Sequence, residues 1–84
     1  MDLVADFEHI NSKIINILQS EFKVNSEIEL TSKLRDDLGL DSLKLMELMN
    51  FVEDEFDIDV EDEDFEVPIV VISDLVKLIQ RKLK

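Results

Sequence analysis

Residues 37–56 read DLGLDSLKLMELMNFVEDEF, and this stretch carries the clearest structural pattern in the chain. After Asp41, apolar residues recur every three or four positions, which is the spacing of one face of an α-helix. This stripe consists of Leu45, Leu48, Met49, Val52 and Phe56. Asp41 is a good N-cap residue, and Gly39 suits a backbone turn with positive φ. We therefore expect a helix that begins near Asp41–Ser42.

Two further helices are predicted, one on either side of this one. Apolar residues repeat with helical spacing over Leu3–Phe22. A second stripe near the carboxyl end consists of Ile72, Leu75, Val76, Ile79 and Leu83. Three amphipathic helices cannot each bury an apolar face alone, so we expect them to pack together as a bundle.

The segments between these helices complete the expected fold. Apolar residues within Lys23–Leu40 indicate that this long connection lies across the bundle. Asp59–Glu66 is expected to form one short helical turn with Phe65 pointing inward, which Pro68 prevents from extending. The predicted fold class is all-α, a small four-helix bundle of three main helices and one short helix. Residues 1–84 are expected to form a single domain.

Charge and composition exclude several classes of protein. The 84 residues have a formal net charge of −12, and residues 36–66 alone hold fourteen acids and one base, Lys44. Such a field repels nucleic acid and favours partners that present Lys and Arg. The chain has no Cys, so it contains no disulfide and no thiolate metal site. No apolar run approaches the length of a membrane span, and the first residues do not resemble a secretory signal, so we expect a cytoplasmic monomer.

The helix over residues 41–56 leaves apolar side chains on the face opposite its stripe. A helical wheel places Leu43 and Met46 there, among acidic residues. The acids expected on this face are Glu47, Glu53 and Asp54, and Asn50 lies beside them. An apolar pair inside an acidic rim is typical of a small docking surface.

Residues for catalysis or metal binding are scarce. His9 is the single histidine, and neither a catalytic triad nor a zinc site can be assembled around it. The acidic run after Asp57 fails the EF-hand spacing, because the sixth position is not Gly and the twelfth is not Glu. Diffuse binding of divalent cations stays open from charge density alone. We expect no enzymatic activity.

Ser42 is the remaining candidate for chemistry. A Ser at a helix start is usually a cap, but Asp41 can fill that role and leave the Ser42 hydroxyl pointing outward. A phosphate ester there would meet the positive end of the helix dipole. No base lies nearby in the sequence, so another protein would have to activate the hydroxyl.

The motif around Ser42 resembles that of the acyl carrier proteins, especially the discrete carriers of fatty acid and polyketide synthesis. The resemblance is dense over residues 36–60, where DLGLDSL precedes an acidic amphipathic helix, and it extends more loosely along the chain. It implies an acyl-carrier-like four-helix bundle in which Ser42 bears a 4′-phosphopantetheine arm and Asp41 is the flanking acid.

The same resemblance implies a function and partners. A phosphopantetheinyl transferase would attach the arm from coenzyme A with magnesium, and the arm's thiol would hold acyl groups as thioesters. Acyltransferases and synthases with basic patches would dock on Leu43, Met46, Glu47, Glu53 and Asp54. The bundle interior, lined by Leu45, Leu48, Met49, Ile72 and Val76, would either shelter an acyl chain or form a closed core.

Two departures and two alternatives accompany this interpretation. Lys44 and Asn50 differ from carriers of primary fatty acid synthesis, so polyketide or other lipid biosynthesis stays open beside that pathway. Leu40-Asp41 before Ser42 favours acyl cargo over the amino acids of peptidyl carriers, and Leu43 after Ser42 argues against a D-alanyl carrier. An acidic helical adaptor that binds a basic partner without a prosthetic group is the alternative from a different class.

Overall fold

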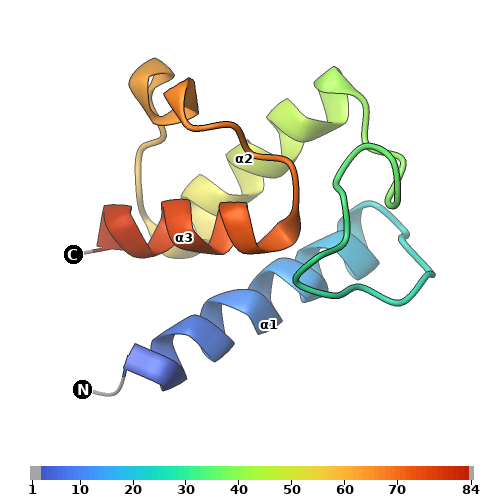
Figure 1. The fold of residues 1–84 in the computed structure, drawn as a ribbon, viewed down its shortest axis with the longest axis horizontal. Coiled ribbons are helices and arrows are strands. Elements are labelled where there is room, and N and C mark those ends of the chain that lie inside the picture. The colour runs from blue at the N-terminus through green and yellow to red at the C-terminus, as the bar shows by residue number, and fades with distance from the viewer. Residues whose placement is uncertain (1–2, 84) are drawn as a thin grey trace.

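The computed structural model describes the backbone of residues 3–83 and the side chains of residues 7–83. Within it lie three α-helices and one 3₁₀ helix: α1 (Leu3–Glu21), α2 (Ser42–Phe56), η1 (Asp62–Glu66) and α3 (Ile72–Leu83). Figure 1 shows α3 lying above α1 with α2 behind them, while the connection between α1 and α2 occupies one end of the bundle. The predicted all-α bundle of three main helices and one short helix is confirmed. The single-domain expectation for residues 1–84 stays a prediction and includes three residues outside those described.

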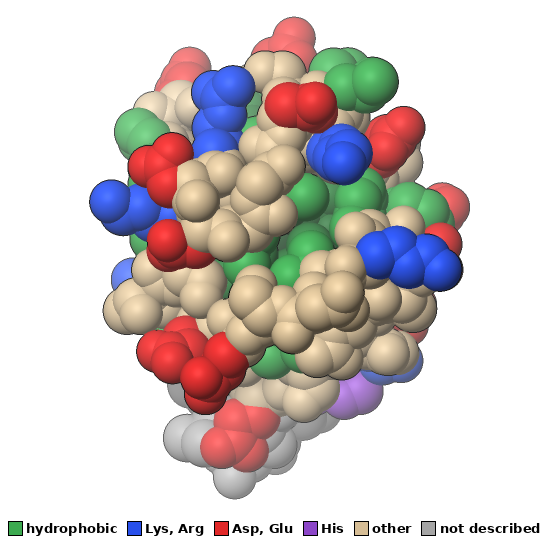
Figure 2. All heavy atoms as spheres, turned by 90° about the vertical axis from the view of Figure 1, so that its right-hand side faces the viewer, with side chains coloured by type: hydrophobic (Ala, Val, Ile, Leu, Met, Phe, Trp, Pro, Cys, Tyr) green, Lys and Arg blue, Asp and Glu red, His purple; other side chains and the backbone are tan. Residues whose placement is uncertain are grey.

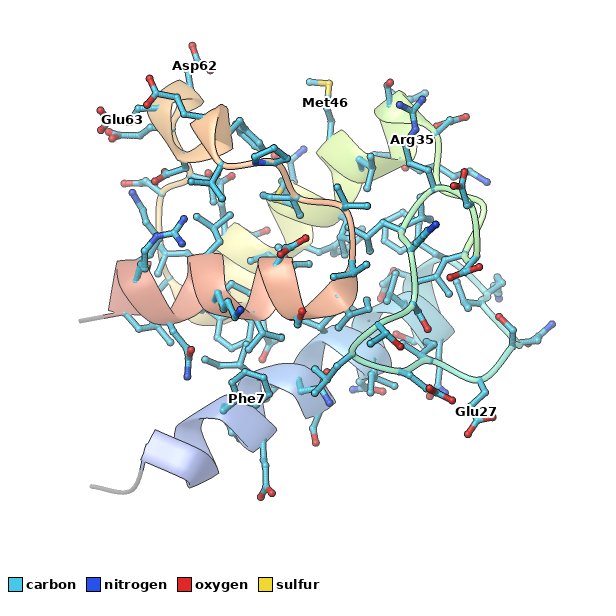
Figure 3. All side chains as sticks on the ribbon, viewed as in Figure 1. Phe7, Glu27, Arg35, Met46, Asp62 and Glu63 are labelled. Carbon is cyan, nitrogen blue, oxygen red and sulfur yellow. The ribbon has the colours of Figure 1, made fainter. Side chains whose placement is uncertain are left out.

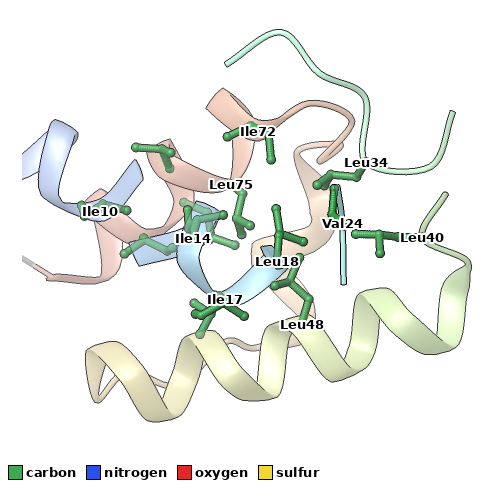
Figure 4. Packing of buried hydrophobic residues seen from close by; sticks show 14 residues of the cluster. Ile10, Ile14, Ile17, Leu18, Val24, Leu34, Leu40, Leu48, Ile72 and Leu75 are labelled. Carbon is green, nitrogen blue, oxygen red and sulfur yellow. The ribbon is translucent and has the colours of Figure 1, made fainter. Parts of the chain in front are cut away.

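The hydrophobic core is built by all three main helices and by the connection. In Figure 4, side chains from α1 and α3 meet those of α2 and of the segment after α1. The buried apolar residues are Ile10, Ile14, Ile17, Leu18, Val24, Leu34, Leu40, Leu48, Val52, Ile72, Leu75, Val76, Leu78 and Ile79. Because apolar burial is the main favourable term in folding, these residues hold the bundle together.

Two details of the predicted core are wrong. Leu83 was expected on the buried stripe of the last helix, but its side chain is 47% exposed, because it is the last residue of α3 and lies beyond Ile79, the last buried residue of that helix. Phe65 was expected to point inward, but it is 48% exposed. Its short helix is a 3₁₀ turn with no buried residue, so Phe65 lies across the rim of the bundle instead of inside it.

The connection between α1 and α2 lies across the bundle, as the sequence predicts. Leu34 and Leu40 are buried, and the backbone of this segment pairs with the segment before α3. Leu34 N donates to Val70 O at 2.9 Å, and Ile72 N donates to Ser32 O at 3.1 Å. The pairing includes an isolated antiparallel bridge between Lys33 and Val71. The connection is therefore held in place both by its buried side chains and by its backbone hydrogen bonds.

Candidate functional site

Ser42 is the first residue of α2, and the turn before it positions its hydroxyl. Gly39 has φ of +72°, as its place in the sequence predicts, and no atom lies within 4 Å of where a Cβ would stand. The glycine is therefore needed for its backbone conformation and not for space. Leu40 then returns to the core, where its side chain is 3% exposed. The buried Leu40 anchors the start of α2 two residues before Ser42.

Asp41 caps α2 and leaves Ser42 available. The Asp41 carboxylate accepts a hydrogen bond from Lys44 N at 2.9 Å, and Leu45 N donates to Asp41 O at 2.9 Å. Ser42 is exposed, and within residues 7–83 its hydroxyl makes no hydrogen bond to another side chain or to the backbone. A free hydroxyl at the amino end of a helix suits a phosphodiester, because the backbone N–H groups and the helix dipole favour an anion. The site therefore fits a phosphopantetheine arm.

Leu43 and Met46 extend an exposed apolar surface from Ser42 along α2. Their side chains are 65% and 68% exposed, and Figure 3 shows Met46 pointing away from the bundle. Glu47 and Asp54 are exposed on the same helix. These four residues form the outward face that the helical wheel predicts.

Glu53 differs from the other acids expected on this face. Its side chain is only partly exposed, and its carboxylate accepts a hydrogen bond from Val60 N at 2.8 Å. Ile58 N also donates to the backbone oxygen of Glu53, at 3.1 Å. Glu53 therefore holds the segment after α2 in place. The helical wheel missed this role because it describes only the residues of one helix and not the segment that returns against it.

The exposed apolar surface continues beyond α2, which sequence reasoning also missed. Phe65, Val67 and Val70 are 48%, 57% and 50% exposed on η1 and on the segment before α3. A small hollow of about 160 Å³ lies between α2 and this segment, lined by Leu45, Met46, Met49, Phe65 and Ile69. The run of apolar residues around Pro68 was the available signal, since a short irregular segment cannot bury them all.

The residues expected to line the bundle interior differ in burial. Leu48, Ile72 and Val76 are fully buried. Leu45 and Met49, by contrast, are partly exposed and line the small hollow beside η1.

Two acidic side chains, one on η1 and one on α3, have lowered pKa values. The pKa of Asp64 is lowered by a hydrogen bond from Glu61 N and by Lys82, whose Nζ lies 3.0 Å from Asp64 Oδ2. The same pair raises the pKa of Lys82 and ties η1 to the end of α3. The pKa of Asp74 is lowered because its carboxylate accepts hydrogen bonds from Val70 N and Val71 N. These contacts fix the loops that surround the outward face.

Figure 2 views the connection side of the molecule, where hydrophobic side chains lie in a central hollow among charged ones. Among the described residues, no group of three His, Cys, Asp or Glu side chains is arranged to hold a metal ion. Nor does the described part of the chain include a helix long and apolar enough to cross a membrane.

Comparison with known proteins identifies the family of this site. A family model described as the phosphopantetheine attachment site matches residues 12–79. The chain belongs to the acyl carrier protein family. An acyl carrier protein of Thermotoga maritima is 40% identical over 81 residues, covering 95% of this chain and 99% of the relative. One from Exiguobacterium is 47% identical over 58 residues, covering 69% of this chain and 72% of the relative.

The fold agrees with this assignment. The crystal structure of an acyl carrier protein from Thermotoga maritima superposes with a TM-score of 0.80 at 25% sequence identity, covering 93% of this carrier and 91% of that chain. The resemblance stated from the DLGLDSL motif is therefore confirmed, and with it phosphopantetheine as the prosthetic group. The adaptor without a prosthetic group and the amino-acid carrier are not favoured by these matches.

Proposed function

We propose that Ser42 is the residue of this carrier to which phosphopantetheine is attached. The observation that supports this most strongly is the exposed, unbonded Ser42 hydroxyl beside a neighbouring residue, Asp41, that already caps the helix. The arm supplies a thiol that holds an acyl group as a thioester, which this chain cannot do alone because it has no Cys. The chain acts as a carrier in fatty acid, polyketide or related lipid biosynthesis, and not as a catalyst.

Attachment requires a transferase, because the carrier supplies only the nucleophile. Ser42 Oγ forms the new bond to phosphorus of coenzyme A, and adenosine bisphosphate leaves with the electron pair of the broken P–O bond. The hydroxyl proton passes to a base of the transferase, since the Asp41 carboxylate next to Ser42 is engaged by Lys44 N. The N–H groups of the first turn that Asp41 does not engage, together with the helix dipole, would favour the negative charge of the phosphodiester.

Loading by a transferase tests this assignment. The protein is incubated with coenzyme A, magnesium and a broad-specificity phosphopantetheinyl transferase, and its intact mass is measured. We expect the mass of one phosphopantetheine to be added to the wild type and to Ser26→Ala, an exposed serine elsewhere, and none to Ser42→Ala. Loading of Ser42→Ala, or failure of the wild type with several transferases, contradicts the proposal.

We further propose that partner enzymes dock through basic patches on Leu43, Met46, Glu47 and Asp54, and that Glu53 supports this face by accepting the hydrogen bond from Val60 N. The two exposed apolar residues and the surrounding carboxylates support this, because charge complementarity guides docking and apolar contact stabilises it. Leu43→Glu should slow loading at Ser42 about tenfold or more, whereas Leu83→Glu, on a residue 47% exposed at the end of α3, should not slow it. Equal rates for the two variants contradict a docking role for Leu43. Cytoplasmic location and monomeric state stay predictions.

A further inference from the structure

A second hollow lies on the other side of α2, between that helix and the end of α1. This α1–α2 groove has a volume of about 380 Å³ and is lined by Glu21, Phe22, Glu47, Asn50, Phe51 and Asp54. It is thus larger than the hollow beside η1, and its lining contains three acids and no base. The helical wheel and the resemblance to carriers place Glu47 and Asp54 on the docking face, but they assign no role to Glu21, Phe22 or Phe51.

Two aromatic rings form the wall of the groove. The centroids of Phe22 and Phe51 lie 5.7 Å apart, with their planes at 83° in a T-shaped contact. Such a contact uses the face of one ring and the edge of the other, so aromatic surface remains for a third group. Phe51 is in fact 37% exposed, which is unusual for a Phe on a helix that packs against its neighbour.

The carboxylates at the groove have no partner among the described residues. Where α1 and α2 meet elsewhere, Lys13 Nζ pairs with Glu55 Oε2 at 2.8 Å. In contrast, Glu21, Glu47 and Asp54 make no ion pair within residues 7–83. The groove therefore combines exposed aromatic surface with uncompensated negative charge.

We propose that the α1–α2 groove binds an arginine side chain of a partner enzyme. A guanidinium group is planar and weakly hydrated, and it both stacks on aromatic rings and pairs with carboxylates. A lysine ammonium matches this lining less well, because it is a strongly hydrated point charge. Since Glu47 belongs both to the groove and to the docking face, a partner seated on Leu43 and Met46 reaches the groove and thereby contacts α1. This inference rests on the proposed carrier function.

The test uses the phosphopantetheine-loaded, isotopically labelled protein and two blocked tripeptides, acetyl-Ala-Arg-Ala-amide and acetyl-Ala-Lys-Ala-amide. We expect the arginine peptide to shift the NMR signals of Phe22, Asn50 and Phe51 in a saturable manner. The lysine peptide should bind about threefold or more weakly. Equal affinity for the two peptides, or saturable shifts elsewhere on the chain but not at these residues, overturns the proposal.

A matched pair of variants separates the groove from general attraction to an anionic surface. Glu21→Gln with Phe51→Leu removes one charge and one ring from the groove, and should weaken arginine-peptide binding about tenfold. Glu27→Gln with Phe65→Leu removes the same groups from other exposed sites and should leave the affinity unchanged. Thermal melts show that each variant is folded, and Glu21→Gln alone serves if Phe51→Leu unfolds the chain. An equal loss in both pairs overturns the groove assignment.

The same samples distinguish failure of this inference from failure of the proposed function. Loading of phosphopantetheine is read from the intact mass before any peptide is added. Protein that is loaded normally but does not distinguish the peptides leaves Ser42 as the attachment residue and removes the arginine site. Protein that cannot be loaded contradicts the carrier proposal itself.

Discussion

Helices α3 and α2 differ in how many of their side chains are buried. Five of the twelve residues of α3 are buried, whereas α2 buries two of its fifteen, Leu48 and Val52, and η1 buries none. Charge divides the same way, since residues 36–66 carry a net −13 and residues 67–84 a net +3. The α1–α3 half therefore supplies most of the stability, while the α2–η1 half keeps apolar and acidic side chains at the surface for recognition.

The strongest test of this difference in stability is to truncate one apolar residue in each half. Leu75→Ala on α3 removes a fully buried side chain and should lower the free energy of unfolding by about 3 kcal/mol. Met46→Ala on α2 removes a side chain that is 68% exposed and should change it by less than about 0.5 kcal/mol. Urea denaturation measures both values. Similar losses at the two sites would show that the outward face of α2 contributes to stability as much as the core does.

Asp74 holds the backbone of the segment between η1 and α3, which joins the two halves. Its lowered pKa means that the folded state favours the ionised carboxylate, which accepts hydrogen bonds from Val70 N and Val71 N. This stability is present above the ordinary pKa of about 4 and is lost as the pH falls through the lowered pKa. Asp74→Ala should lower the free energy of unfolding at neutral pH by about 1 kcal/mol and weaken its loss in acid. Asp62→Ala is the control, because the Asp62 carboxylate accepts no such hydrogen bond within residues 7–83, and an equal effect of both variants contradicts this role.

The sequence predicts the three main helices, which helical periodicity governs, better than it predicts the segments between them. The predicted range of α1 and the predicted start of α2 agree with the structure to within about two residues, because apolar spacing, the Asp41 cap and Gly39 are local signals. Ser42 and the outward Leu43 and Met46 follow from the same helix. The site is thus predicted where it lies on a regular element.

Apart from Leu83 at the end of α3, the errors fall where backbone outside the three main helices decides the environment. Phe65 lies on a 3₁₀ turn that the ion pair between Lys82 and Asp64 joins to α3, a contact that helical periodicity does not contain. Glu53 was placed by its angle on α2, but the returning segment at Val60 covers it. The groove at Phe22 and Phe51 likewise requires two helices to meet, which no single-helix pattern contains.

Salt should act mainly on the acidic half. Screening of like charges in residues 36–66 outweighs screening of the two ion pairs that link this segment to α1 and α3, Lys13–Glu55 and Lys82–Asp64. We expect the melting temperature to rise by about 3 °C between low salt and about 0.5 M NaCl. Glu63→Gln should reduce this rise and Glu27→Gln, outside the segment, should leave it unchanged. A melting temperature independent of salt would mean that the local geometry already offsets the repulsion.

The smallest expected effect concerns the residues that end α1 and α2. Lys23 and Asp57 follow these helices with φ of 59° and 55°, in the left-handed region that favours glycine. Lys23 supports a helix end in which Val24 N donates to Leu18 O at 3.1 Å. Lys23→Gly removes the conformational strain and should raise the free energy of unfolding by about 0.5 kcal/mol, a gain partly offset by the greater entropy of the unfolded chain.

Asp57→Gly is the matched comparison for Lys23→Gly. Aspartate tolerates the left-handed conformation better than lysine does, so the gain at residue 57 should be smaller. Both variants are compared by urea denaturation in about 0.5 M NaCl, because Asp57→Gly also removes a charge from the acidic segment and low salt would add that effect. A loss of stability in Lys23→Gly, or a larger gain in Asp57→Gly, would mean that unfolded-state entropy or contacts of the Lys23 side chain outweigh strain at the end of α1.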